Sequence, residues 1–189
     1  MKIGPRYRLP FRRRLKKKTD YKKRLKLLYS KENRLVIRKS LKHMRAQIIS
    51  FDFKGDKILV SASSQDLKKL GWDYTSNNIV SSYLVGLLIG KKALKKNIKK
   101  AILDIGLHKS VKGSKLYSVL KGAIDAGLSI PHSTEILPTE ERITGKHIIE
   151  YAQKLKKESK KEYKKQFSKS QPEKIQEMFD KVKAKIMKM

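Results

Sequence analysis

The pattern of apolar and polar positions predicts a three-stranded antiparallel meander in the first third of the chain. Strands are predicted at residues 34–38, 45–53 and 57–62, which are rich in Ile, Val and Leu. In the second strand the alternation places Ala46, Ile48 and Phe51 on the inner face. Residues 54–56, Lys-Gly-Asp, predict the turn that joins it to the third.

Two helices and a fourth strand are predicted next. Apolar side chains recur at helical spacing over residues 75–96, and this stripe is typical of a core-facing helix. Gly86 and Gly90 lie four residues apart on another face, where they allow a neighbour to approach closely. The sequence then predicts a buried strand at 101–106, a helix at 113–127 that Gly127 ends, and a short extended piece at 128–131. This βββαβα order predicts an α/β fold with a mixed β-sheet and flanking helices.

In the first 20 residues the apolar positions show neither helical nor strand periodicity. Pro5 and Pro10 also break helices, so we expect an extended arm. A short helix begins after it, with Thr19 as the expected N-cap. These features divide the chain into a basic arm with a short helix (1–30), an α/β core domain (31–135), and a loop with a helical extension (136–189).

The extension is predicted to hold two helices. One covers residues 146–166 and grows rich in lysine, and the second follows a capping box at 170–173 with Pro172 in its first turn. The second helix carries an apolar stripe. Its members are Ile175, Met178, Phe179, Val182 and Ile186. This stripe must pack on something, either the domain or a neighbouring protein.

Charge narrows the choice of partner. The chain has 48 Lys and Arg against 17 Asp and Glu, a net charge of +31, and a polyanion is the natural partner of such a surface. Residues 1–45 hold 19 basic and 2 acidic side chains and nine of the ten arginines. Arginine binds phosphate bidentately and stacks on bases, which favours specific RNA contacts at this end. Tyr7, Phe11 and Tyr21 stand among the arginines, where they suit base stacking or pin the arm to its own domain.

Other classes of function find little support in the sequence. No apolar run approaches the roughly 20 residues of a membrane helix, the charged N-terminus does not read as a secretory signal, and cysteine is absent. No histidine stands in a metal-binding motif and there is no P-loop.

The predicted strand order is shared with ribonuclease H-like nucleases, which hold two Mg²⁺ with clustered carboxylates. The available aspartates are Asp52, Asp66, Asp104 and Asp125. Asp104 lies in the fourth strand, but the first strand has no carboxylate to pair with it, so we expect no enzyme, no catalytic residue, no metal and no cofactor.

Several long segments resemble one ribosomal family. Residues 4–28 read GPRYRLPFRRRLKKKTDYKKRLKLL, and residues 34–51 read RLVIRKSLKHMRAQIISF. GWDYTSNNIVSSYLVGLLIGKKA at 71–93, AILDIGL at 101–107 and GSKLYSVLKGAIDAGLSIPHS at 113–133 follow in order. Together they resemble the archaeal and eukaryotic type of the large-subunit protein that binds 5S rRNA, numbered eighteen in the bacterial naming.

The resemblance implies a non-catalytic, ribonuclease H-like sheet domain in a structural protein of the large ribosomal subunit in the cytoplasm. Its expected partners are 5S rRNA, 23S rRNA in the central protuberance, and neighbouring ribosomal proteins, with no membrane and no second copy of the chain. The chain length fits the archaeal class. The RNA-binding residues carried over from the motifs are Arg6, Tyr7, Arg8, Phe11, Arg12, Arg13, Arg14, Lys18, Thr19, Tyr21, Arg24, Arg38, His43 and Arg45. An RNA chaperone or assembly factor that leaves the mature particle is the alternative.

Overall fold

A four-stranded mixed sheet forms the centre of the molecule in the computed structural model, which describes residues 4–158, 160–167 and 171–189. The strands are β1 (Arg34–Lys39), β2 (Met44–Ser50), β3 (Lys57–Ser63) and β4 (Ile102–Asp104), in the order β3-β2-β1-β4. The first three form an antiparallel meander, and β4 pairs in parallel with β1 at the edge. The predicted α/β class with a mixed sheet is therefore confirmed.

Two strand predictions are wrong in detail. Phe51 was expected on the inner face, but β2 ends at Ser50 and the Phe51 side chain is 44% exposed. Ile48 and Ile49 are both buried although they point to opposite faces, because Ile48 enters the core and Ile49 lines the cavity on the second face of the sheet. The predicted extended piece at 128–131 forms only an isolated bridge between Lys100 and Ser129.

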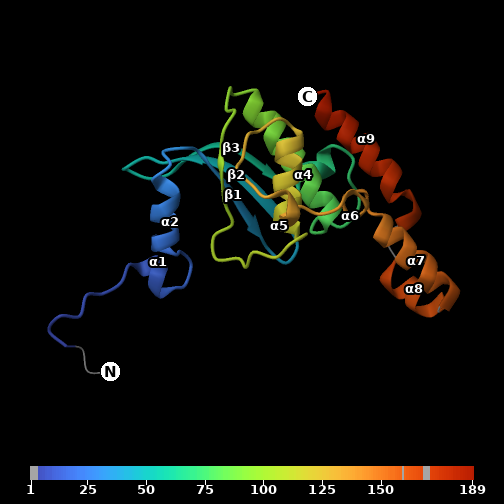
Figure 1. Cartoon of the computed structure of the whole chain (residues 1–189). Helices are drawn as coiled ribbons and strands as arrows, with labels where there is room; N and C mark the ends of the chain where they lie inside the picture. The colour runs from blue at the N-terminus through green and yellow to red at the C-terminus, as the bar shows by residue number, and fades with distance from the viewer. Residues whose placement is uncertain (1–3, 159, 168–170) are drawn as a thin grey trace.

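Two helices, α4 (Ile79–Leu94) and α5 (Lys115–Asp125), pack on each other and cover one face of the sheet (Figure 1). The Asn78 side chain caps α4 by accepting a hydrogen bond from the Ser81 backbone N–H at 2.7 Å, and the Ser81 hydroxyl accepts one from the Asn78 backbone N–H at 3.2 Å. The close approach expected at Gly86 is confirmed, because a Cβ there would lie 2.1 Å from the Val119 carbonyl oxygen of α5. Gly127, with φ +110°, ends α5 as predicted.

The C-terminal part of the chain is helical and packs back on the domain. Its elements are α6 (Glu140–Thr144), α7 (Lys146–Glu158), α8 (Lys160–Gln166), a 3₁₀ turn at Pro172–Lys174 and α9 (Ile175–Met187). The apolar stripe of α9 joins the core, where Phe179 packs on Tyr83 of α4 with ring centroids 5.7 Å apart. The domain, rather than a neighbouring protein, therefore covers this stripe. The predicted helix at 146–166 is observed as α7 and α8, and Ser170 of the predicted capping box lies outside the described residues.

The N-terminal segment differs from the expected extended arm. A turn at Pro5 and Arg6 is followed by irregular chain up to a helical turn, α1 (Arg12–Leu15), and α2 (Tyr21–Leu28) follows it. The predicted N-cap is wrong by one residue, because Asp20 caps α2 by accepting from the backbone N–H groups of Lys22 and Lys23 at 3.0 and 3.1 Å.

Two short elements complete the described parts of the chain. They are α3 (Asp66–Lys69) and a 3₁₀ turn at Thr134–Ile136. No helix in the described parts is long and apolar enough to cross a lipid bilayer.

Candidate nucleic-acid interface

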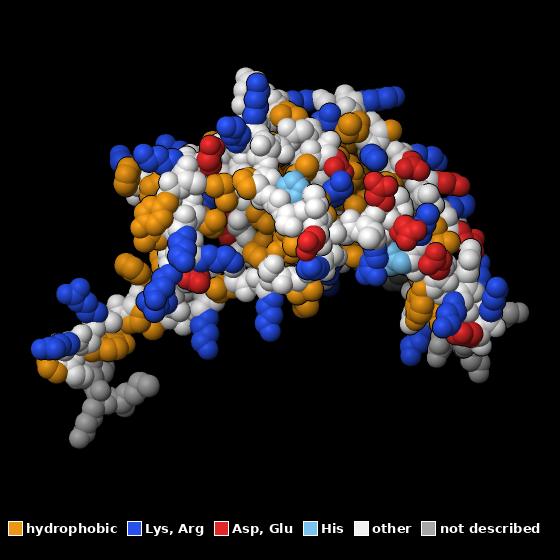
Figure 2. Space-filling view, in the orientation of Figure 1, with side chains coloured by type: hydrophobic (Ala, Val, Ile, Leu, Met, Phe, Trp, Pro, Cys, Tyr) orange, Lys and Arg blue, Asp and Glu red, His pale blue; other side chains and the backbone are white. Residues whose placement is uncertain are grey.

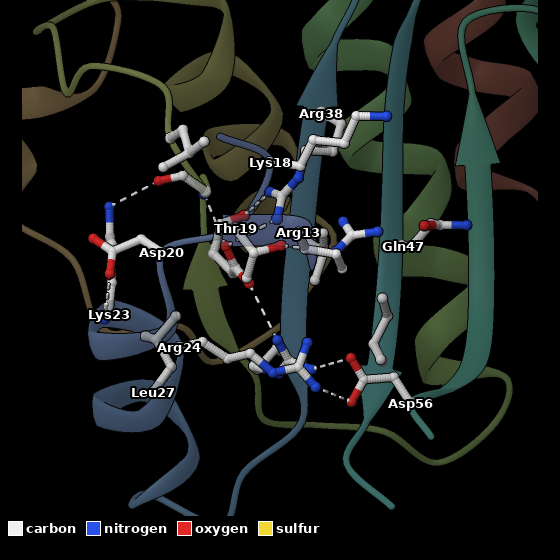
Figure 3. A pocket seen from close by; sticks show the side chains of 16 residues that line it. Arg13, Lys18, Thr19, Asp20, Lys23, Arg24, Leu27, Arg38, Gln47 and Asp56 are labelled. Atoms are coloured by element: carbon white, nitrogen blue, oxygen red, sulfur yellow. Dashed lines mark hydrogen bonds and ion pairs between the residues drawn. The ribbon is translucent and has the colours of Figure 1, made fainter. Parts of the chain in front are cut away.

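The second face of the sheet carries charged and polar side chains instead of a layer of helices. Successive side chains of a strand point to opposite faces, so Leu35 and Ile37 of β1 enter the core while Arg34 and Arg38 point the other way. The segment with α1 and α2 lies over part of this second face, and Figure 3 shows its side chains directed toward those of the strands.

A chain of ion pairs runs across this face and joins α2 to the sheet. Arg24 of α2 contacts one carboxylate oxygen of Asp56 at 2.9 Å, and Arg34 contacts the other at 2.8 Å. Arg34 also reaches the carboxylate of Asp104 at 3.2 Å, and Arg38 contacts the same carboxylate at 3.2 Å. Arg34 is only 2% exposed and Asp104 6%, and an unpaired charge at such depth is costly. The two aspartates therefore hold the buried guanidinium in place.

The strand register explains why Asp104 meets two arginines. Asp104 of β4 is the parallel partner of Val36, and Arg34 and Arg38 are the residues two before and two after Val36 on the same face. Arg38 adds hydrogen bonds to the carbonyl oxygens of Ile37 and Asp104, both at 2.8 Å. These three residues lie far apart in the sequence, and only the strand register shows that they meet.

A cavity of about 240 Å³ lies between the α1–α2 segment and the sheet. Its lining includes five of the predicted RNA-binding residues. They are Arg13, Lys18, Thr19, Arg24 and Arg38. The Arg13 Nε–H donates to the Thr19 hydroxyl at 2.8 Å, and the Lys23 ammonium donates to the Gly106 carbonyl at 3.2 Å.

The cavity retains positive charge once its internal pairs are formed. Asp20 caps α2, while Asp56 and Asp104 are held by arginines. The cations Arg13, Lys18 and Lys23 also line the wall, and no ion pair to an acidic side chain is recorded for them among the described residues. The site is therefore suited to an anionic group such as a phosphate.

A second hollow, of about 270 Å³, adjoins the first and shares Arg38 with it. His43 and Arg45, the other predicted residues of the strand motif, line it together with Lys39, Ser40 and Gln65. The His43 ring lies 3.4 Å from the Ser64 hydroxyl and 3.5 Å from the Gln65 side-chain nitrogen. The tertiary structure therefore brings the strand-motif residues next to those of the arm.

The other predicted residues do not enter either cavity. Arg6, Tyr7 and Arg8 lie exposed on the segment before α1, and Arg12 and Arg14 are exposed on α1 itself. The two remaining aromatic residues, Phe11 and Tyr21, pack against each other with ring centroids 4.9 Å apart. This pairing supports the interpretation that aromatic residues pin the arm, while the Phe11 ring remains largely exposed.

Further cations that the sequence analysis did not single out gather where β1 ends. Burial lowers the pKa of Lys115, and the charge of Lys39 lowers it further. The pKa of His108 is also lowered, first by burial and then by the charges of Lys39 and Arg38. These cations come from three separate segments of the chain, so the sequence did not reveal that they lie near one another.

Charge is also distributed unevenly over the face of the molecule that Figure 2 shows. On the face shown in Figure 2, acidic side chains gather over the C-terminal helices. The opposite end, with α1 and α2, shows mainly lysine and arginine beside apolar side chains (Figure 2). This polarity would direct a polyanion toward the end that carries α1, α2 and the cavity between them and the sheet.

The four aspartates considered for a nuclease site lie apart from one another. Asp104 binds arginines, Asp52 pairs with Lys57 at 2.6 Å, Asp66 lies 3.8 Å from Lys92, and Asp125 accepts a hydrogen bond from the Tyr83 hydroxyl at 2.8 Å. Within residues 4–158, 160–167 and 171–189, no three His, Cys, Asp or Glu side chains are grouped so that they could hold a metal ion.

An α/β domain with cations gathered on the open face of its sheet has the features expected of a nucleic-acid-binding protein. The chain matches the family described as ribosomal large subunit proteins 60S L5 and 50S L18, over residues 5–100 and 95–133. The match covers more than half of the chain, and the chain therefore belongs to this family. It is a large-subunit ribosomal protein, and its place is the ribosome of the cytoplasm.

Proposed function

We propose that this protein binds 5S rRNA and attaches it to 23S rRNA in the central protuberance, as a structural constituent of the large subunit. The observation that carries the proposal is the pair of cation-lined hollows that share Arg38 on the open face of the sheet. Most of the residues that line them lie in segments 4–28 and 34–51, whose sequence resembles the 5S-rRNA-binding family. Family membership favours a permanent constituent over an assembly factor that leaves the particle.

The hollows would bind the RNA backbone, and the arm would extend the contact. Phosphates in the hollows would meet Arg13, Lys18 and Arg45, while the ion pairs to Asp56 and Asp104 keep Arg24 and Arg38 in fixed positions. The exposed segment before α1 reaches away from the domain (Figure 1), so its arginines are placed to contact a second RNA surface. This division of contacts suits a protein that joins two RNA molecules.

The test is direct binding of the full chain to 5S rRNA over a series of salt concentrations, with transfer RNA as the unrelated control. We expect tighter binding to 5S rRNA and a linear fall of log K with log[salt], with a slope of roughly 0.7 to 0.9 for each phosphate neutralised. Replacing Lys18 and Arg45 by Ala should reduce both the affinity and the slope. Equal affinity for the two RNAs, or binding independent of salt, would contradict the proposal.

A further inference from the structure

The hairpin that joins β2 and β3 ends in two aromatic side chains that the core does not use. Phe53 is 97% exposed and Phe51 is 44% exposed. Their rings touch edge to face, with centroids 5.4 Å apart and an interplanar angle of 69°. Phe51 thereby supports one side of the Phe53 ring, while most of the Phe53 surface remains open to solvent.

The acidic groups of this hairpin are neutralised within the protein. Lys57 pairs with Asp52 at 2.6 Å, and Asp56 is held by Arg24 and Arg34. Lys54 stands beside Phe53, is exposed, and has no ion pair among the described residues. The tip therefore presents an open aromatic ring next to a cation, with its carboxylates already satisfied.

The hairpin is also tied to the candidate RNA interface. The contact of 2.9 Å between Arg24 and Asp56 joins α2 to the residue just before β3. In Figure 1 the hairpin projects past α2 on the side from which the N-terminal segment leaves the domain. An RNA bound to the arm and to the cavity that Arg24 and Asp56 line would therefore pass within reach of the tip.

We propose that the tip formed by Phe51, Phe53 and Lys54 is an additional RNA contact, at which an unpaired base stacks on Phe53. Single-stranded loops and bulges expose bases that proteins recognise by stacking on aromatic rings. Lys54 is placed to meet a phosphate next to the stacked base. An RNA occupant is favoured over a protein because the ring is flanked by a cation and lies at the positively charged end of the molecule.

This inference rests on the proposed binding of 5S rRNA, and the same RNA is the probe for its test. Phe53→Ala should weaken binding of the full chain to 5S rRNA by roughly five- to a hundredfold, the range expected when one stacked base is lost. The salt slope should not change, because no phosphate contact is removed. Phe53→Trp should retain the affinity, and Phe53→Leu, which keeps an apolar side chain without a π face, should behave like Phe53→Ala.

Leu41 provides the matched control. It also is 97% exposed, and it lies in the turn between β1 and β2. Leu41→Ala should leave the affinity unchanged, since an aliphatic side chain offers no face for stacking. Circular dichroism would establish that each variant is folded, which is expected because neither side chain is buried.

The possible outcomes separate the two proposals. If the unchanged protein binds 5S rRNA no better than transfer RNA, the proposed function fails. If it binds 5S rRNA well and Phe53→Ala binds equally well, the tip is not an RNA contact. If Phe53→Leu retains full affinity, the contact is apolar packing and the stacking proposal is overturned.

Discussion

The buried Arg34 side chain lies at the centre of the ion pairs that position the other arginines of the cavity. Its guanidinium is buried on the face of β1 that points away from the core, and it bridges Asp56 and Asp104. Each aspartate in turn holds a second arginine, Arg24 or Arg38, that lines the candidate interface. The buried charge therefore helps to hold Arg24 and Arg38 in fixed positions at the wall of the cavity.

The first prediction concerns Asp56. Asp56→Asn removes the charge that Arg24 and Arg34 share, while Arg34 keeps Asp104, so we expect a loss of about 1–3 kcal/mol in the free energy of unfolding. Chemical denaturation would measure it. Asp52→Asn is the control, because it removes an exposed pair with Lys57 in the same hairpin and should cause no measurable change. Equal stability of the two variants would show that Asp56 does not support the buried charge.

A second prediction concerns His108 and the pH dependence of the free energy of unfolding. The pKa of His108 lies below its usual 6.5 in the folded protein, because burial and the charges of Lys39 and Arg38 oppose protonation. The unfolded chain therefore binds the proton more readily, so the stabilising contribution is complete above about pH 6.5 and is lost as the pH falls through the folded pKa. We expect His108→Gln to make the free energy of unfolding less sensitive to acid, as measured by urea denaturation between pH 8 and pH 5. An unaltered pH profile would contradict this expectation.

Among the elements, α1 differs most from what the sequence suggested. Pro5 and Pro10 indicated an extended chain, but both prolines precede α1, and Arg12–Leu15 closes one helical turn. A hydrogen bond from Arg13 to Thr19 ties the turn to the loop before α2. The three consecutive arginines therefore do not alternate as they would in a strand; Arg13 faces the cavity, and Arg12 and Arg14 remain exposed.

The prediction for this element separates arginine geometry from charge. Replacing Arg12, Arg13 and Arg14 by Lys keeps the charge and removes the bidentate phosphate contacts, so we expect RNA binding to lose roughly 1–3 kcal/mol. The salt slope should remain the same, because the number of neutralised phosphates does not change.

A second variant isolates the exposed pair. The double replacement of Arg12 and Arg14 by Lys leaves the bond between Arg13 and Thr19 intact, and it should reproduce much of the loss. Unchanged affinity of the triple variant at every salt concentration would mean that the arm acts only as a polycation.

For the whole molecule, α9 links the C-terminal end of the chain to the core. Ile175, Phe179, Val182 and Ile186 are buried, and Phe179 packs on Tyr83 of α4. Fully burying one such side chain contributes about 1.5–3 kcal/mol before the entropy cost of ordering the helix, so α9 is expected to stabilise the domain. The lysine-rich end of the chain is therefore part of the folded unit, on the side opposite to α1 and α2 (Figure 1).

A third prediction of stability concerns Phe179, the aromatic residue of the α9 stripe. Phe179→Ala leaves a cavity between α9 and α4, and we expect a loss of about 3–5 kcal/mol in the free energy of unfolding. Met187→Ala, at a half-exposed position near the end of the same helix, should cost much less. Thermal denaturation would compare the stabilities of the two variants. Similar melting temperatures would show that packing of Phe179 adds little to the stability of the core.

The sequence by itself determined the class of fold, most of the elements and the basic character of the N-terminal end. Hydrophobic periodicity and composition are local properties, so the meander, α4, α5 and the α9 stripe could be predicted from neighbouring residues. Some residues that the arm and strand motifs predicted to bind RNA, such as Arg13, Arg38 and Arg45, line the two hollows, and their contact with RNA stays a prediction.

Only the tertiary structure decided which of these residues meet. The partners of Arg34 depend on the register between β1 and β4, and the covering of the α9 stripe depends on α4, almost 100 residues away in the sequence. The exposure of Phe53 likewise follows from where β2 ends and the hairpin leaves the domain. Contacts of this kind arise from packing and strand pairing between distant segments, and a local pattern carries no information about them.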